Sequence, residues 1–389
     1  MTIDIDNFRA LTAHLKSTEV LWKPRPFVGL PVSWESAFPK MSRALRSLTV
    51  TEVEAIRSDL TKIVSVSPEL SDLYHRNEQL TGFPALEAQD GLIDPRRNPL
   101  RVSGRKWRQI ERFASAVIPR SSGLIDRWVD WCSGKGHLGR ALSDVSGIET
   151  IFVERNPELC EAGFVNADVL EDDLNHLFSR GSGAVALHAC GNLNAKLLQC
   201  VVKSDCRFLA VAPCCYQRIV GHTYVPLSET GSAQDLHLGS HHLRLVSFEE
   251  VVLGRGAKAR RNRDHIYRLA FDLLAREATG TDRYRPLGPL PGAFFGGTFE
   301  QFAKRVAQKE KIDLPRKWDP LSYETRGKAR WELNRALSLV RSLFARCLES
   351  WLFSDRVLFL QENGWFTEAG TFCDRKVTPR NLLIIARPR

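Results

Sequence analysis

The chain has 389 residues, of which 43% are hydrophobic and 26% charged, a composition typical of a globular protein with room for two or three domains. No segment has the roughly 18 uninterrupted apolar residues that a membrane span needs, and the N-terminus lacks the basic start and apolar core of a secretory signal. Nine cysteines, an odd number, do not suggest a disulfide framework. We therefore expect a cytoplasmic protein without a membrane partner, and the formal net charge of +10 favours an anionic partner.

Residues 1–95 are predicted to form a helical N-terminal region. Thr51 and Glu54 have the spacing of a capping box, in which each side chain accepts a backbone N–H of the other residue. Ser67 followed by Pro68 is the pattern of a second helix start. Both patterns favour helices over strands in this region.

Residues 96–215 have the pattern of an α/β core. Short apolar runs recur along this segment, separated by stretches with helical periodicity. The runs are RWVDW, TIFVER, VALHAC and FLAVAPC, at residues 127–131, 150–155, 185–190 and 208–214. This rhythm is typical of βαβ units, so we predict a doubly wound, Rossmann-like sheet of parallel strands.

The rhythm stops after residue 215. Residues 216–350 are predicted to be a helical insert with a basic run and one long helix over 330–351. The apolar face of that helix is formed at spacings of three and four by Leu337, Val340, Phe344, Leu348 and Trp351. Residues 351–389 end in two apolar segments joined by a turn, and we expect these strands to complete the edge of the sheet.

A glycine-rich turn follows the first predicted strand. Gly134, Gly136 and Gly139 have the G-x-G-x-x-G spacing and precede a predicted helix. Such a turn brings backbone N–H groups and a helix N-terminus close to an anionic ligand. Two cofactors fit this pattern, since a nicotinamide dinucleotide offers a pyrophosphate and S-adenosylmethionine offers a carboxylate.

One acid, Asp130, favours S-adenosylmethionine over the dinucleotide, and two further acids suit the rest of the cofactor; an acid at the position of Glu154 is used by both cofactors. Asp130, four residues before the first glycine, suits an ammonium or sulfonium charge and would repel a pyrophosphate. Glu154, at the end of the second strand, can accept hydrogen bonds from ribose hydroxyls, and Asp168 can accept one from the adenine amino group. The predicted cofactor-binding residues are Asp130, Cys132, Gly134, Lys135, Gly136, His137, Glu154, Asp168 and His188.

The ends of the fourth and fifth strands carry the candidate catalytic residues. His188 can act as a general base, and Cys190, Cys214 or Cys215 can act as a nucleophile or a soft metal ligand. Tyr216 offers a stacking surface for a base. A zinc site formed by His188, Cys190, Cys214 and Cys215 is an alternative, but these residues lack a C-x-x-C spacing, so no metal site is predicted. Packing in the core is the other alternative for all of these side chains.

Two basic runs favour RNA as the substrate. The first consists of Arg96, Arg97, Arg101, Arg105, Lys106 and Arg108, and the second of Arg255, Lys258, Arg260, Arg261, Arg263 and Arg268. Their charges can contact phosphates, and Trp107 and Tyr267 can stack on bases. The alternative for both runs is a solvated face.

The strand ends restrict the acceptor atom. The fourth strand ends in HACG, whereas enzymes that methylate an exocyclic base nitrogen usually have an Asn/Asp-Pro-Pro-aromatic sequence there. Methylation of cytosine C5 requires a cysteine nucleophile, and Pro213-Cys214 is not preceded by the acid-x pattern of that chemistry. An oxygen or a ring nitrogen needs only positioning and a base, so we expect one of these.

Several motifs of the chain resemble those of a known protein family. VDWCSGKGHLGRAL, LHACGNL, APCCYQRIV, FSDRVLFLQENGW and VTPRNLLIIARP are similar to motifs of the methyltransferase-like protein 25 family, and Arg105, Lys106 and Glu111 match a further motif upstream. The chain is more distantly similar to tRNA 2'-O-methyltransferases, which share the HxCG and paired-cysteine strand ends. The resemblance extends from about residue 100 to the end. It implies a class I methyltransferase sheet with S-adenosylmethionine above Gly134 and Gly136.

The predicted function is therefore S-adenosyl-L-methionine-dependent methyl transfer to an oxygen or ring nitrogen of RNA, either tRNA or rRNA. A protein methyltransferase and a non-catalytic RNA-binding module on the same fold are the alternatives. A nicotinamide oxidoreductase is favoured only by the glycine spacing.

Overall fold

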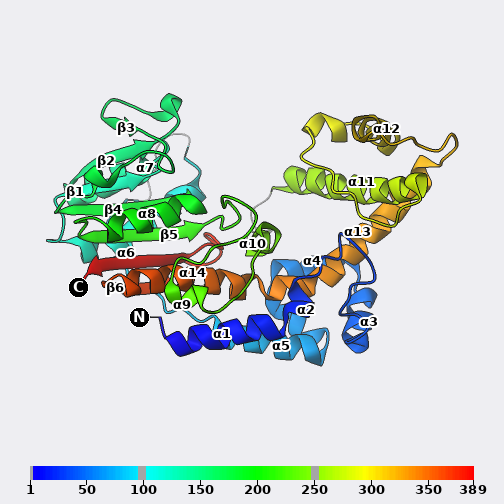
Figure 1. Ribbon diagram of the computed structural model, residues 1–389, viewed down its shortest axis with the longest axis horizontal. Coiled ribbons are helices and arrows are strands. Elements are labelled where there is room, and N and C mark those ends of the chain that lie inside the picture. Colours follow the sequence, from blue (N-terminus) through cyan, green and yellow to red (C-terminus); the bar gives the residue numbers. More distant parts are fainter. Residues whose placement is uncertain (1–2, 95–101, 247–253) are drawn as a thin grey trace. The chain divides into compact units, whose positions relative to one another are not determined.

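The computed structural model describes residues 3–94, 102–246 and 254–389 (Figure 1). The chain forms two compact units. Unit 1 comprises Met1–Ser17, Glu78–Glu249 and Ala345–Arg389, and unit 2 comprises Thr18–Asn77 and Glu250–Phe344. Among the described residues, no helix is both long enough and apolar enough to cross a membrane.

Unit 1 contains a seven-stranded sheet with the order β3-β2-β1-β4-β5-β7-β6. The strands are β1 (Arg127–Trp131), β2 (Glu149–Glu154), β3 (Phe164–Asn166), β4 (Ser182–Cys190), β5 (Phe208–Cys214), β6 (Trp365–Thr371) and β7 (Leu382–Pro388). The first five strands are parallel, and β7 pairs antiparallel with both β5 and β6. The C-terminal strands thus complete one edge of the sheet, as the sequence predicts.

Helices cover both faces of this sheet. They are α1 (Ile5–Ser17), α6 (Gly104–Ser121), α7 (His137–Ser146), α8 (Asn192–Val202), α9 (Glu229–Ser232), α10 (Ser240–Val246) and α14 (Ala345–Glu362). On one face, Leu209 and Val211 of β5 share a core with α8 and α14. On the other face, Phe208 and Ala210 share a core with α6 and α7. Alternate side chains of one strand therefore serve two cores, and the predicted doubly wound α/β fold is confirmed.

Unit 2 is helical and has its own core. Its helices are α2 (Glu19–Trp22), α3 (Pro39–Ser47), α4 (Val50–Ser58), α11 (Arg255–Thr279), α12 (Phe299–Glu310) and α13 (Pro320–Leu343), while α5 (Pro68–Leu80) begins in unit 2 and ends in unit 1. Aromatic side chains dominate the core around α11 and α12, with Tyr267, Phe271, Phe299 and Phe302 packed together.

Two predicted helix boundaries are corrected. The capping box of α4 is formed by Thr49 and Glu52, because the helix starts two residues earlier than predicted. Glu54 instead binds Lys258 and Arg335. The single helix predicted over 330–351 is two helices, since α13 ends at Leu343 and α14 begins at Ala345. The predicted start of α5 at Ser67 and Pro68 is confirmed, with the Ser67 hydroxyl accepting the Leu70 N–H at 3.3 Å.

Candidate functional site

The glycine turn lies between β1 and α7. Gly134 and Gly136 have positive φ angles of 58° and 67°, and Gly136 is the N-cap of α7. A Cβ atom at Gly136 would lie 2.9 Å from the ring of Phe152, which stacks on Phe164 at 4.6 Å. A Cβ atom at Gly134 would meet no described atom within 4 Å. The rings of Phe152 and Phe164 therefore pack against the turn at Gly136, whereas the space at Gly134 is open.

A polar atom without a partner lies in the same turn. Among the described atoms, the Ser133 hydroxyl is buried and has no hydrogen-bond partner. Buried hydroxyls are normally paired, so an unpaired one at a binding turn is consistent with a ligand that would complete it. The sequence analysis did not single out Ser133.

The three predicted acids have different environments. Glu154, at the end of β2, accepts the Gly134 N–H and the Asn156 N–H, each at 2.9 Å. Asp168 forms an ion pair with Arg155 at 3.2 Å, and the Leu170 N–H holds its pKa below the usual range. Glu154 thus lies beside the open side of the turn, and Asp168 follows β3 on the same edge of the sheet.

Asp130 is 2% exposed, and its Oδ2 accepts the Gly139 N–H at 3.0 Å. Burial raises the pKa of this carboxyl to about 7, although the Gly139 hydrogen bond opposes the shift. Asp130 therefore holds the first turn of α7 in place. A direct contact between its buried carboxylate and a cofactor, as predicted, is not favoured by this position.

The other predicted residues of the turn differ in exposure. Lys135 is exposed, and its carbonyl accepts a hydrogen bond from Arg140 at 2.6 Å. His137, the first residue of α7, is half-buried, and burial together with Lys106 lowers the pKa of its imidazole. Burial and the nearby Glu154 raise the pKa of Cys132 to about 12, so this side chain remains a neutral thiol.

Three residues at the ends of adjacent strands adopt strained backbone conformations. Five described non-glycine residues have positive φ, and three of them are Cys132 after β1, His188 in β4 and Cys215 after β5. Their φ angles are 59°, 75° and 47°. Such conformations cost about 1–3 kcal/mol each and cluster at functional sites. The strain therefore marks the carboxyl edge of β1, β4 and β5 as the candidate site.

His188 lies where β4 departs from regular pairing, since its register with β5 shifts between Leu187 and Cys190. The residue is exposed. Desolvation by the surrounding strand ends, and then the charge of Lys106, lower the pKa of its imidazole below 6.5, while Cys215 opposes the shift and Arg380 adds to it. The imidazole is consequently neutral at pH 7 and able to accept a proton.

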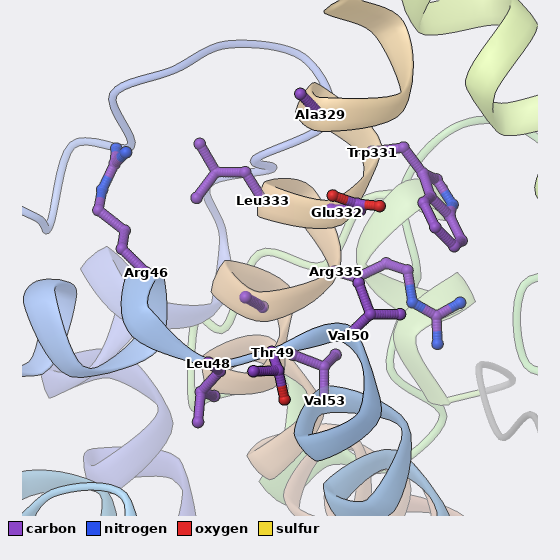
Figure 2. Close-up of a pocket in the computed structure, with 11 residues that line it drawn as sticks. Arg46, Leu48, Thr49, Val50, Val53, Ala329, Trp331, Glu332, Leu333 and Arg335 are labelled. Atoms are coloured by element: carbon purple, nitrogen blue, oxygen red, sulfur yellow. The ribbon is translucent and has the colours of Figure 1, made fainter. Parts of the chain in front are cut away.

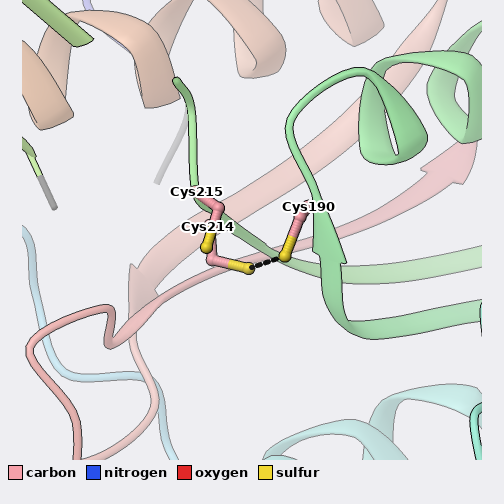
Figure 3. Close-up of side chains that lie close together, drawn as sticks. All are labelled: Cys190, Cys214 and Cys215. Carbon is pink, nitrogen blue, oxygen red and sulfur yellow. Dashed lines mark hydrogen bonds between the residues drawn. The ribbon is translucent and has the colours of Figure 1, made fainter. Parts of the chain in front are cut away.

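Cys190, Cys214 and Cys215 form one cluster at this edge (Figure 3). Their sulfur atoms all lie within 4.8 Å of one another, and Cys190 Sγ is 3.6 Å from Cys214 Sγ. The two neighbouring thiols, and then Arg380 and Arg218, hold the pKa of Cys215 well below its usual range. The geometry thus brings together three residues that the sequence predicted separately.

The prediction that three aromatic residues stack on bases is wrong, because all three are buried. Tyr216 is 1% exposed, and the Arg356 guanidinium covers its ring at 4.6 Å. Trp107 is 7% exposed in the core beneath α6, and Tyr267 is 6% exposed in the aromatic core of unit 2. All three rings are large apolar surfaces that fill cores, so none of them can stack on a base.

Only some of the charged side chains in the two basic runs are exposed and could contact phosphates. In α6, Arg105, Lys106 and Arg108 are exposed. In α11, Arg260 and Arg263 are exposed. Two further members of the second run are bound within the protein, since Lys258 pairs with Glu54 and Arg268 with Asp264. Outside the part that the structure describes lie Arg96, Arg97, Arg101 and the side chain of Arg255.

Two pockets accompany these sites, one in each unit. A pocket of about 480 Å³ in unit 1 lies among residues that follow β3 and residues of α8, including Leu170, Asn192 and Lys196. A pocket of about 300 Å³ in unit 2 lies between α4 and α13 (Figure 2). In the second pocket, Arg46 is bound to Glu35. Of these two pockets, the one in unit 1 borders the carboxyl edge of the sheet.

Sequence reasoning missed Arg218 and Arg380 as well as Ser133. Arg218 follows β5, and its carbonyl accepts the Asn192 N–H at 3.0 Å. A Cβ atom on Gly191 would lie 1.9 Å from that carbonyl oxygen, so only glycine permits the approach. In the sequence, the glycine of HACG was the one feature that could have indicated this close contact with the Arg218 carbonyl. Arg380 lies in the loop between β6 and β7, more than 160 residues away, and no local pattern connects it to the cysteines.

Comparison with known proteins defines the class of this fold. A family model described as a methyltransferase domain matches residues 105–222, from α6 to just beyond β5. Together with the doubly wound sheet, this match defines a class I methyltransferase domain.

Three curated relatives are named for a glutathione S-transferase C-terminal domain. The protein from Drosophila melanogaster is 30% identical over 247 residues, which cover 58% of this chain and 41% of the relative. Those from Xenopus laevis and Homo sapiens are 31% and 30% identical over 121 residues, 29% of this chain and 19% of each relative. The chain thus spans less than half the length of these relatives. No solved structure matches it.

Proposed function

We propose that the chain transfers a methyl group from S-adenosylmethionine to an oxygen or ring nitrogen of RNA. The observation that carries the cofactor is the open space at Gly134, whose N–H donates to Glu154. The preceding residue, Ser133, has a buried hydroxyl without a described partner. The similarity of the strand-end motifs to those of the methyltransferase-like protein 25 family also supports S-adenosylmethionine as the cofactor.

The residues of the turn fit this cofactor. The space at Gly134 can admit an amino-acid carboxylate close to the N-terminus of α7, while the Gly134 N–H itself donates to Glu154. Glu154 can accept ribose hydroxyls, and Asp168 can accept the adenine amino group, both at the ends of neighbouring strands. When bound, S-adenosylmethionine supplies a methyl group on a positively charged sulfur.

His188 is the proposed general base. Its neutral imidazole can take the proton of an acceptor hydroxyl or ring N–H as the methyl group is transferred. The strained backbone at His188 is consistent with this role, because a φ of 75° is sustained only where the surrounding structure requires it.

RNA is favoured by the charges near the site. The exposed start of α6 carries Arg105, Lys106 and Arg108, and Lys106 lies close enough to His188 to shift the imidazole pKa. Phosphate groups bound there would be close to the proposed base. In unit 2, Arg260 and Arg263 offer a second cationic surface.

Calorimetric titration with S-adenosylhomocysteine and with NAD tests the cofactor, and we expect stoichiometric binding of the former alone. Mass spectrometry of total RNA and of bulk protein from cells with and without this chain tests the acceptor. Loss of one methylated nucleoside is the expected result. A change confined to protein would establish the protein methyltransferase, and binding of RNA with neither change would establish the non-catalytic module.

A further inference from the structure

We propose that Cys190, Cys214 and Cys215 form a binding site for one soft divalent metal ion, zinc foremost, with its fourth coordination position open. The sulfurs come from the ends of two adjacent strands, where Cys190 and Cys214 are register partners, and all lie within 4.8 Å of one another. Three thiolates at 2.3 Å from a tetrahedral zinc ion would be about 3.8 Å apart. The spacing of the cluster therefore suits such an ion with little movement.

The strained backbone brings the third sulfur into the cluster. Consecutive residues of a regular strand point to opposite faces, so Cys214 and Cys215 would normally separate their sulfurs. Because Cys215 has a φ of 47°, its side chain instead joins those of Cys190 and Cys214, as Figure 3 shows. Bringing these sulfurs together thus has a conformational cost that packing alone does not require.

The loops around the cluster hold it in place. The Cys214 carbonyl accepts the Gly191 N–H, and the Cys215 carbonyl accepts the Arg218 N–H. The Arg218 carbonyl in turn accepts the Asn192 N–H. Two hydrogen bonds of 3.0 Å therefore join the segments after β4 and β5, and the bond of 2.9 Å between Arg218 and Cys215 closes the turn after β5. A rigid frame of this kind orients ligands before a metal arrives.

Charge and burial also suit a metal with an open position. Arg218 and Arg380 act on the charge of Cys215 and can offset the net negative charge of three thiolates and a divalent ion. Cys214 is 2% exposed, whereas Cys190 and Cys215 are half-buried, so the cluster is accessible from one side. Among the described residues, no histidine or carboxylate joins the three sulfurs. Catalytic zinc sites likewise have three protein ligands and a fourth position for water or substrate.

Titration of the reduced, metal-free full chain with Cd²⁺ tests the site. The absorption of cadmium-thiolate bonds in the ultraviolet reports binding, and competition with a chromophoric chelator gives the affinity for Zn²⁺. We expect one ion per chain. Replacement of one ligand, in Cys190→Ser, Cys215→Ser or Cys214→Ala, should weaken binding by more than about 100-fold, since changes beyond the ligands alone cost 10- to 100-fold.

Cys160→Ser is the matched control, because Cys160 is also half-buried in unit 1 but lies outside the cluster. It should bind the ion as the unaltered chain does. Binding of S-adenosylhomocysteine checks that each variant is folded, and the partly accessible Cys190 and Cys215 remain testable if the Cys214 variant does not fold. Failure of the unaltered chain to bind one ion, or equal binding by the cluster variants and the control, would overturn the proposal. Neither result bears on the cofactor, which is measured separately.

Discussion

Gly134 and Gly136 belong to one turn but leave very different space for a side chain. At Gly134 the space is open, so Gly134→Asp should place a carboxylate where the cofactor carboxylate binds. Like charges about 4 Å apart repel by about 1 to 4 kcal/mol, so the affinity for S-adenosylhomocysteine should fall at least about fivefold in calorimetry. Gly134→Asn is the control, because it has the same shape and backbone strain without the charge. Equal losses in both variants would refute the assignment of this space to the carboxylate.

His188 should control turnover without controlling cofactor affinity. His188→Asn tolerates the left-handed backbone better than most substitutions and removes the base. Turnover should fall by about 10²- to 10⁴-fold, while the affinity for S-adenosylhomocysteine changes little. The acidic limb of the activity profile of the unaltered chain should lie at lower pH than that of an ordinary histidine, because desolvation and then Lys106 lower the imidazole pKa.

Lys106→Gln is the matched test of that electrostatic effect. Removal of the positive charge should raise the His188 pKa, so the acidic limb of the pH profile should move to higher pH. If the fall of activity at low pH occurs at the same pH in Lys106→Gln, or is still present in His188→Asn, a group other than His188 titrates.

At the scale of the element, the N-terminal part of α11 carries the exposed residues of the second basic run, Arg260 and Arg263. Arg260→Gln together with Arg263→Gln should reduce the slope of log affinity for single-stranded RNA against log salt by about 1.4, from about 0.7 for each phosphate contact. Lys304→Gln with Lys309→Gln is the control, because it removes two exposed charges from α12 in the same unit. Equal slopes for both double variants would identify the α11 run as a solvated face.

The elements that could be predicted from the sequence are those with strong local patterns. The strands β1 and β5 match the apolar runs RWVDW and FLAVAPC, because a buried parallel strand is apolar on both faces. The break between α13 and α14 could not be predicted, since residues 328–363 contain neither glycine nor proline and keep a helical apolar period. Tertiary structure alone determines that Leu343 ends one helix.

The site was predictable in its residues but not in its geometry. Motif order identifies the glycine turn, Glu154 and the strand-end cysteines. The positive φ angles of Cys132 and Cys215 have no local signal, because cysteine does not favour such angles. Histidine adopts them more often, but nothing near His188 in the sequence distinguishes it from the other histidines. The burial of Tyr216 under Arg356 likewise depends on a contact between residues 140 positions apart, which no spacing rule reveals.

At the scale of the whole molecule, the division into two units predicts where ligand binding stabilises the protein. Each unit has its own core, since the two cores of the sheet lie in unit 1 and the aromatic core around Phe302 lies in unit 2. A ligand that binds only the folded state at 100 times its Kd stabilises that state by about 2.7 kcal/mol. S-adenosylhomocysteine should therefore slow amide hydrogen exchange in residues 127–154 and leave residues 299–343 unchanged.

Hydrogen exchange followed by mass spectrometry measures both segments in one experiment. Gly134→Asp is the control, because its weaker binding should reduce the protection while both cores remain. Equal protection of both segments in the unaltered chain would mean that the units unfold together and that stabilisation spreads through the whole molecule. Protection limited to residues 127–154 would instead identify unit 1 as the cofactor-binding part and unit 2 as a separately folding part that carries the exposed Arg260 and Arg263.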